Sequence, residues 1–148
     1  MWQSVIAILG TLAGASMTAW FQQRSQRAER AAATATTHRR DALDAVTDLV
    51  TALADHRKAM WLREEARLAG ADWADARTAS HATRAAITAP TVRVTILLPT
   101  LATTAQTAAT ATYTLRNATD HTALAAARED AITATDQLTH AAGQLLAA

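Results

Sequence analysis

Residues 2–21 have the sequence WQSVIAILGTLAGASMTAWF, and the organisation of the whole chain follows from them. This segment contains no Asp, Glu, Lys, Arg or His. As a helix it would measure about 30 Å, the thickness of the hydrocarbon core of a bilayer. Trp2 lies at one end and Trp20 with Phe21 at the other, where such rings prefer the headgroup boundary. The segment predicts one transmembrane helix, with residues 1–22 as a membrane anchor.

Two other interpretations of this segment are weaker. A buried core helix of this length seldom lacks any charged residue. A cleaved signal peptide carries positive charge before its apolar run, and here only the α-amino group precedes it. The triplet Ala13, Gly14 and Ala15 has the composition of a cleavage site, but the apolar run continues past it. A transmembrane helix therefore remains the prediction.

Arginines that follow the apolar run predict its orientation. They are Arg24, Arg27, Arg30, Arg39 and Arg40. Only Glu29 opposes them in charge between residues 22 and 40. The positive-inside rule then predicts a single-pass protein of the cell membrane, with the N-terminus outside and residues 23–148 as a cytoplasmic helical domain.

The same arginines have two candidate partners. Anionic lipid headgroups need nothing beyond the position of the arginines, so the lipid bilayer is the favoured partner. A nucleic-acid backbone is less favoured, because no aromatic residues are interleaved with the cluster and because it follows a membrane span. The predicted membrane-interface residues are Trp2, Trp20, Phe21, Arg24, Arg27 and Arg30.

Small residues recur along one side of the predicted span. Gly10 and Gly14 form a GxxxG pair, which Ala7 precedes and Thr18 continues. Such a strip allows the backbone of another helix to approach closely. We therefore expect self-association through this face, and a homo-oligomer as the result.

A long helix is expected to continue from the span. No Pro or Gly occurs from residue 22 to residue 69, and Gly70 is suited to end the helix. Apolar residues recur on this stretch at spacings of three and four, which makes one stripe that predicts a buried face. They are Ala42, Val46, Leu49, Leu53, His56 and Met60.

Breaks divide the remaining chain into shorter helices. Asp72 is expected to cap a second helix that runs to about Thr88, where Pro90 kinks or ends it. Residues 91–98 alternate as a strand does, but no other segment provides a partner strand, so a helix is favoured there. A third helix is predicted from Pro99 to about Arg116, with Pro99 in its first turn.

A fourth helix is predicted from a cap at Asp120 nearly to the C-terminus. The predicted fold class is all-α, with the single N-terminal transmembrane helix continuing into a small antiparallel bundle of about four helices. Bulky core residues are expected mainly from residues 43–68, 87–101 and 138–146.

The sequence predicts no catalytic, cofactor or metal site. Cys is absent, which excludes thiolate zinc sites, and no His forms an HExxH motif. The charge-dense stretch 55–68 could hold an acid/base pair among Asp55, Arg63, Glu64 and Glu65. Opposite charges three to four residues apart are more typical of a solvated helix face, in which Arg63 and Arg67 pair with nearby carboxylates. We therefore expect no enzyme.

Two pairs of ring residues have structural interpretations. His56 on the apolar stripe and His81 on the second helix are expected to meet across a helix interface, as buried and hydrogen-bonded side chains rather than metal ligands. His38, His121 and His140 carry no further signal. Trp61 and Trp73 are expected to pack at the turn between the first two helices rather than to stack on bases.

Several segments together resemble a known family, the KilB-type proteins of actinobacterial plasmids and genomes. The resemblance implies a membrane-associated protein linked to conjugative plasmid transfer and to spread through the mycelium, and it brings no catalytic residues. Lys58 as the only lysine, together with the excess of Ala, agrees with a GC-rich genome. The segments are HRKAMWLREEARLAGA, SHATRAAITAP and ATYTLRNA, with the anchor WQSVIAILGTLAGA and its arginine-rich exit.

The leading hypothesis is a non-enzymatic, self-associating membrane scaffold or adaptor. Its expected partners are the bilayer, other copies of the chain and a protein of a DNA-transfer apparatus. One alternative is a membrane-tethered nucleic-acid-binding module that uses the arginines from Arg24 to Arg40 with Arg57, Lys58 and Arg63. A pore-forming or membrane-disrupting protein is another, and it would need several copies of the span in a ring.

Overall fold

The computed structural model describes residues 2–147, and it describes the side chains of residues 26, 27, 29, 30 and 32–147. The described chain forms five α-helices and one short 3-10 helix, η1. They are α1 (Trp2–Leu68), α2 (Ala74–Ala86), α3 (Thr88–Leu97), η1 (Pro99–Leu101), α4 (Ala102–Tyr113) and α5 (His121–Ala147). Two compact units comprise residues 1–38 and residues 39–148.

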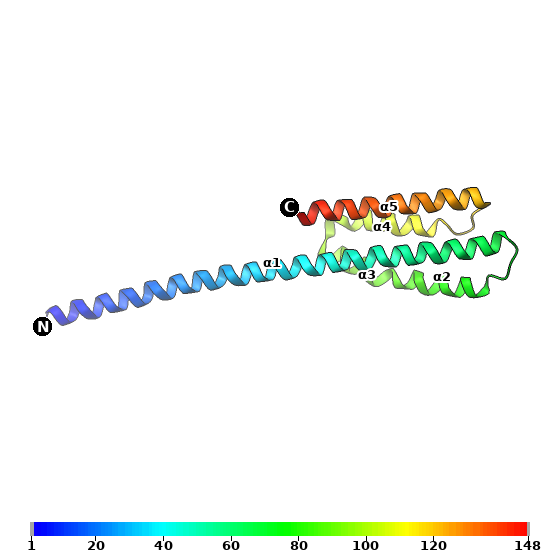
Figure 1. The fold of residues 1–148 in the computed structure, drawn as a ribbon. Coiled ribbons are helices and arrows are strands. Elements are labelled where there is room, and N and C mark those ends of the chain that lie inside the picture. Colours follow the sequence, from blue (N-terminus) through cyan, green and yellow to red (C-terminus); the bar gives the residue numbers. More distant parts are fainter. Residues whose placement is uncertain (1, 148) are drawn as a thin grey trace. The chain divides into compact units, whose positions relative to one another are not determined.

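The second unit is an up-and-down helical bundle. Its chain direction reverses from the C-terminal part of α1 to α2 and α3, again to α4, and again to α5 (Figure 1). Because α2 and α3 follow one another along one layer, the bundle packs four helical rods. The predicted all-α class and the antiparallel bundle are confirmed. Residues 91–98 belong to α3 and its end, so the helical alternative for that stretch is correct.

A glycine ends α1 in the predicted way. Gly70 has φ of +68°, the left-handed conformation that costs other residues energy. Its N–H donates to the carbonyl of Arg67, and the N–H of Ala71 donates to the carbonyl of Ala66. This pair of bonds is the Schellman arrangement, which satisfies carbonyls that the end of the helix would leave unpaired. The long helix and its end near Gly70 are therefore confirmed.

The predicted start of α2 near Trp73 is confirmed, but its N-cap residue is Trp73 and not Asp72, as we had expected. Asp72 Oδ1 accepts the N–H of Ala74 at 3.0 Å, so this side chain supports the first turn. We predicted a helix to about Thr88 that Pro90 kinks or divides. The helix is indeed divided, since α2 ends at Ala86 and α3 begins at Thr88, but the division lies before Pro90. Pro90 lies in the first turn of α3. The backbone N–H groups of a first turn have no carbonyl partner within the helix, so a proline, which lacks this N–H, costs no hydrogen bond there.

Local signals also place the last two helices. Leu98, with φ of −133° and ψ of 68°, leaves the helical region just before Pro99, because the proline ring disfavours a helical residue before it. Asn117 turns the chain with φ of +63°, which Asn tolerates better than most residues. Asp120 Oδ1 accepts the N–H of Ala123 at 2.8 Å and caps α5 as predicted.

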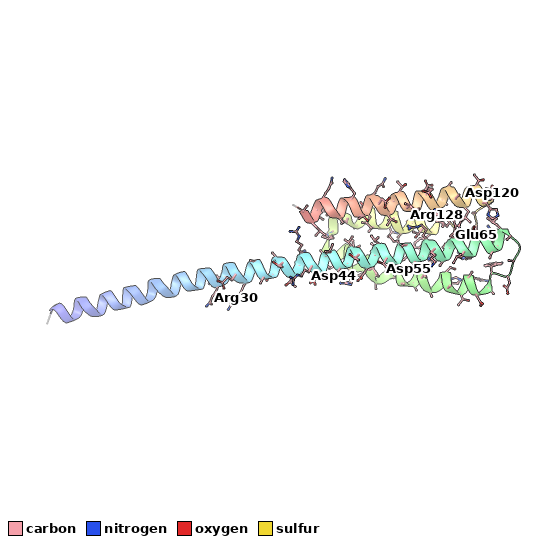
Figure 2. All side chains as sticks on the ribbon, in the orientation of Figure 1. Arg30, Asp44, Asp55, Glu65, Asp120 and Arg128 are labelled. Carbon is pink, nitrogen blue, oxygen red and sulfur yellow. The ribbon has the colours of Figure 1, made fainter. Side chains whose placement is uncertain are left out.

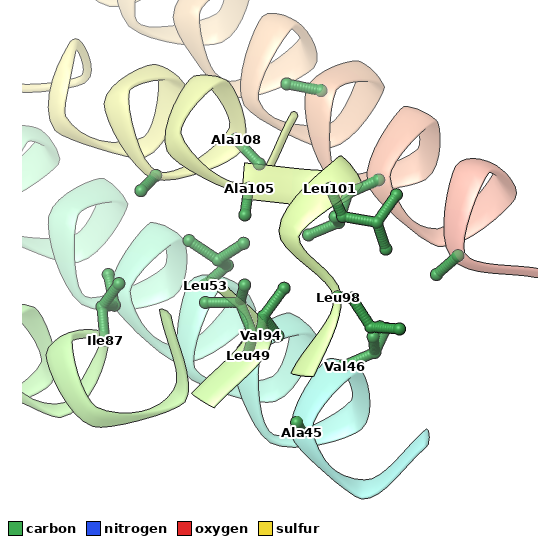
Figure 3. Packing of buried hydrophobic residues seen from close by; sticks show 14 of the residues in the cluster. Ala45, Val46, Leu49, Leu53, Ile87, Val94, Leu98, Leu101, Ala105 and Ala108 are labelled. Atoms are coloured by element: carbon green, nitrogen blue, oxygen red, sulfur yellow. The ribbon is translucent and has the colours of Figure 1, made fainter. Parts of the chain in front are cut away.

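The core combines the α1 stripe with small residues from the other helices. All six residues of the predicted stripe are buried, from Ala42 to Met60. Figure 3 shows Leu49 and Leu53 of α1 near Val94, with Ala105 on α4. Alanines at such contacts let the helix axes approach closely, which explains how a chain with few bulky residues packs. Leu43, which we placed in the core region, is 55% exposed because it falls off the stripe.

Threonines are compatible with these helices because their hydroxyls bond within the helix. The hydroxyl of Thr135, which is buried on α5, donates to the carbonyl of Ala131 at 2.8 Å. Thr112, buried on α4, donates likewise to Ala109 at 2.7 Å. Both buried hydroxyls are therefore hydrogen-bonded, and neither destabilises the fold as an unpaired polar group would.

Candidate functional site

The residues predicted to pack in the membrane lie outside the described side chains. They are Ala7, Gly10, Gly14 and Thr18, and the same holds for Trp2, Trp20, Phe21 and Arg24. Among the residues that the structure does describe, no helix is long and apolar enough to span a membrane. Residues 2–21 belong to α1, so they are helical as predicted. Their role as a membrane anchor stays a prediction.

The segment that follows the predicted anchor is exposed. Arg27 and Arg30 are exposed, as are all residues from 32 to 41. Figure 2 shows the Arg30 side chain on this part of α1. Both arginines are therefore accessible to an anionic partner, whether lipid or nucleic acid.

The charge-dense stretch at the end of α1 differs from the prediction. We expected a solvated face over residues 55–68, but Glu64 is completely buried and Arg63 is 6% exposed. Asp55, by contrast, is exposed (Figure 2). The expected pairing within the helix is present, since Arg67 Nε lies 2.6 Å from Glu64 Oε2 and Arg63 Nε lies 3.5 Å from Glu64 Oε1. Oppositely charged residues within four positions of one another on a helix can thus form ion pairs on a buried face as well as on a solvated one.

Glu64 joins α1 to the connection between α4 and α5. Its Oε2 atom accepts the backbone N–H of Asn117 at 3.2 Å as well as the Arg67 bond. Arg67 Nη2 in turn donates to the carbonyl of Ala118. The Glu64–Arg67 pair therefore supplies the backbone groups of this turn with partners that the turn cannot supply itself.

Arg63 joins α1 to α2. Its Nη1 atom donates to Ser80 Oγ at 3.4 Å, and its guanidinium lies 5.3 Å from the centre of the Trp73 ring. Burial lowers the pKa of Arg63, and the charges of Arg116 and other arginines lower it further, while the Glu64 carboxylate opposes this shift. The positive charge here exceeds what a single carboxylate balances.

His56 is buried as predicted, and its hydrogen-bond partner on α2 is Thr83 rather than His81. Its Nδ1 atom lies 3.0 Å from Thr83 Oγ1, and its ring meets the Tyr113 ring edge-on at 5.5 Å. His81 is exposed. Burial, reinforced by the charges of Arg84 and Arg63, lowers the pKa of His56 to about 4, so the ring is neutral at pH 7. Helical spacing alone did not reveal which α2 residue faces α1.

The two tryptophans, predicted to pack at the turn after α1, have different contacts. Trp73 stacks with Arg63 and with Arg77 near α2, whereas the guanidinium of Arg128 on α5 lies 5.5 Å from the Trp61 ring. Trp61 also packs against the smaller of two core clusters. The two tryptophans therefore contribute to different helix interfaces.

Two comparisons bear on the family. The family model described as KilB plasmid transfer protein matches residues 43–146. Protein KilB of Streptomyces lividans is 47% identical over 145 residues, which covers 95% of this chain and 95% of that protein. The chain belongs to the KilB family. The resemblance inferred from its sequence segments is thereby confirmed.

The KilB match covers nearly all of the helix bundle. Residues 43–146 include the buried Arg63–Glu64–Arg67 network, the His56 environment and all of α2, α3 and α4. The similarity to the Streptomyces protein extends over almost the whole chain. No solved structure matches this chain.

The bundle surface separates basic residues that the sequence groups together. Arg57 and Lys58 line a recess of about 460 Å³ with Arg128, Trp61 and Leu62 among its walls. Arg63, six residues after Arg57, is buried on another side of α1 against Ser80. The three residues of the nucleic-acid alternative, Arg57, Lys58 and Arg63, therefore do not form one surface. Among the described side chains, no group of three or more His, Asp or Glu residues could hold a metal ion.

Proposed function

We propose that this KilB family member is a non-enzymatic, membrane-anchored and self-associating helical scaffold that serves plasmid transfer. The proposal concerns an assembly role, with the bilayer, other copies of the chain and a protein of the DNA-transfer apparatus as partners. Plasmid transfer comes from the family and from the name of the family model. Anchoring and self-association come from the sequence of residues 2–21.

One observation carries the proposal, namely that α1 is a single helix from Trp2 to Leu68. The uncharged segment and the buried stripe of the bundle belong to this same helix. Association of anchors would therefore hold the bundles of neighbouring copies at a high local concentration, where even weak contacts between bundles become occupied.

The proposed topology places the N-terminus outside and residues 23–148 in the cytoplasm. The arginines after the uncharged segment support it, and the exposure of Arg27 and Arg30 leaves them accessible to anionic headgroups. A cytoplasmic bundle would also have access to plasmid-transfer proteins and to DNA.

Crosslinking in native membranes, followed by mass spectrometry, tests the proposal directly. We expect crosslinks between copies of the chain and to a second protein, both lost when residues 1–22 are replaced by an unrelated monomeric membrane span. Crosslinks to a partner that persist after this replacement, with none between copies, would contradict the self-associating scaffold. Recovery of the full-length chain from lysate without detergent would contradict the anchor itself.

A DNA-binding titration distinguishes the nucleic-acid alternative. Binding through arginine–phosphate contacts requires an affinity that falls steeply as salt increases. Salt-sensitive binding by the full-length chain, without crosslinks between copies, would favour that alternative over the scaffold. Leakage of dye from liposomes would favour the pore-forming alternative.

A further inference from the structure

A small recess opens where α1, α2 and the end of α4 meet. Its volume is about 20 Å³, roughly the room that one water-sized group needs. We call it the arginine recess. It is lined by His56, Met60, Arg63, Ser80, His81, Arg84, Tyr113 and Arg116.

Positive charge dominates this recess. Three of its lining residues, Arg63, Arg84 and Arg116, carry guanidinium groups, and no Asp or Glu lines it. Glu64 pairs with Arg63 from outside the lining, but its Oε2 atom is already engaged by Arg67 and Asn117. Among the described residues, neither Arg84 nor Arg116 forms an ion pair. The recess therefore holds more cationic groups than the protein neutralises.

Buried polar atoms at the recess are poorly satisfied by the described residues. His56 is 1% exposed, and its Nε2 atom has no hydrogen bond. Arg63 is nearly as buried; its Nε atom has only the long 3.5 Å ion pair with Glu64 Oε1, and its Nη1 atom contacts Ser80 at 3.4 Å and the sulfur of Met60, a weak acceptor, at 4.0 Å. An unpaired buried donor or acceptor costs about 1–3 kcal/mol, so a ligand that pairs these atoms would bind favourably.

Cation–π contacts help to position two of the guanidinium groups. Arg84 lies 4.2 Å from the centre of the Tyr113 ring, and Arg63 lies 5.3 Å from the centre of the Trp73 ring. A cation over an aromatic ring is held by the electrons of the ring face, and the N–H groups of Arg84, which make no ion pair among the described residues, remain able to bond an oxyanion. Because the groups are already positioned, less side-chain entropy is lost when a ligand binds.

We propose that the arginine recess binds a terminal phosphoryl group, either as free phosphate or as the monoester of a small ligand. A terminal phosphoryl group offers three free oxygens and close to two negative charges, which suits three convergent guanidinium groups. The small volume admits one of its oxygens while the others remain at the mouth with Arg84 and Arg116. Hydrogen phosphate carries both a donor and acceptors, so it can satisfy His56 Nε2 in either tautomer.

Isothermal titration calorimetry of the full-length chain in a neutral detergent, with inorganic phosphate at constant ionic strength, tests this site. We expect saturable binding that Arg84→Ala and Arg116→Ala each weaken about tenfold or more, since each removes a charge-assisted contact. Arg128→Ala is the matched control, because Arg128 also stacks on a tryptophan but lies outside the recess. Circular dichroism establishes that each variant is folded. Absence of saturable binding, or an equal loss in Arg128→Ala, overturns the proposal.

Competition then identifies the source of the phosphoryl group. A nucleoside monophosphate that displaces phosphate indicates a soluble ligand, vesicles with phosphatidic acid that displace it indicate a lipid headgroup, and displacement by neither indicates free phosphate. Each of these three results supports the site. A single-stranded DNA without terminal phosphates that displaces inorganic phosphate most tightly would overturn it, because the recess would then recognise a diester backbone. The site and its test do not depend on the scaffold role.

Discussion

Glu64, completely buried on α1, accepts the backbone N–H of Asn117 at 3.2 Å, although the two residues lie 53 positions apart. The same carboxylate pairs with Arg67 and Arg63, so the end of α1 and the connection between α4 and α5 share one buried ionic network. Such a network favours one conformation of the α4–α5 connection, because its backbone groups would lose their bonds to Glu64 and Arg67 in any other.

Removal of the Glu64 carboxylate is expected to destabilise the bundle strongly. Glu64→Ala leaves Arg63 buried among other arginines without its counter-charge, which should lower the free energy of unfolding by about 3–5 kcal/mol. Denaturant unfolding followed by circular dichroism measures this. Glu65→Ala, which removes the same charge one residue later, should change it by less than about 1 kcal/mol. Equal effects of the two substitutions would show that the buried network contributes little.

Two leucines on α1 should differ sharply when truncated. Leu53 is completely buried in the main core, whereas Leu62 is 52% exposed. Leu53→Ala is expected to cost about 2–5 kcal/mol, the usual range for a buried leucine, and Leu62→Ala about 0.5 kcal/mol or less. Unfolding curves of the two variants decide the matter. A large cost at Leu62 would mean that this side chain is covered in the protein as it exists in solution.

Acid should destabilise the bundle through His56. Its pKa in the folded protein is about 4, below the ordinary 6.5, so the unfolded chain binds the proton more readily. The free energy of unfolding is therefore unaffected by this group above pH 6.5. It decreases as the pH falls from 6.5 towards 4, by up to about 3 kcal/mol in total. Melting temperatures across this interval should fall steeply for the native chain and less for His56→Gln. His140→Gln, exposed on α5, should retain the native profile.

Glycine substitutions should have opposite signs at two positions. Gly70 has φ of +68°, and a Cβ added there would meet no atom within 4 Å, so Gly70→Ala costs only the left-handed backbone strain of about 1–2 kcal/mol. Gly143 lies within α5 with equally open surroundings, and Gly143→Ala should stabilise by about 0.5–1 kcal/mol. Thermal unfolding of both variants measures the difference. The same sign at both positions would contradict the conformational explanation.

Self-association should depend on the small-residue face of residues 7–18. Gly14→Leu fills the predicted strip of close approach and should lower the oligomer signal in a membrane reporter assay by severalfold. Ser16→Leu adds a side chain of the same size on the opposite side of the helix and should leave the signal near the native level. An unchanged signal for Gly14→Leu would remove this face from the proposed assembly.

Signals within a few residues of one another were sufficient to predict most helix boundaries. Gly70, Asp72, Pro99 and Asp120 each act on backbone groups close by, so their effect does not depend on the rest of the fold. The buried stripe from Ala42 to Met60 follows likewise from helical periodicity. Pro90 was the exception, because a proline is compatible with the first turn of a new helix as well as with the break before it.

Residue order alone determined that this chain is helical, where α1 ends and which stripe of α1 is buried, because these properties arise from local conformation and spacing. Only the tertiary structure decided that Arg63 and Glu64 are covered, that His56 meets Thr83 and Tyr113, and that arginines from α1, α2 and the end of α4 converge on one recess. Oppositely charged residues at helical spacing look alike whether water or another segment covers them. Here Glu64 is covered by the turn at Asn117, which is 53 residues away in the sequence. The position of that turn depends on how the whole bundle packs.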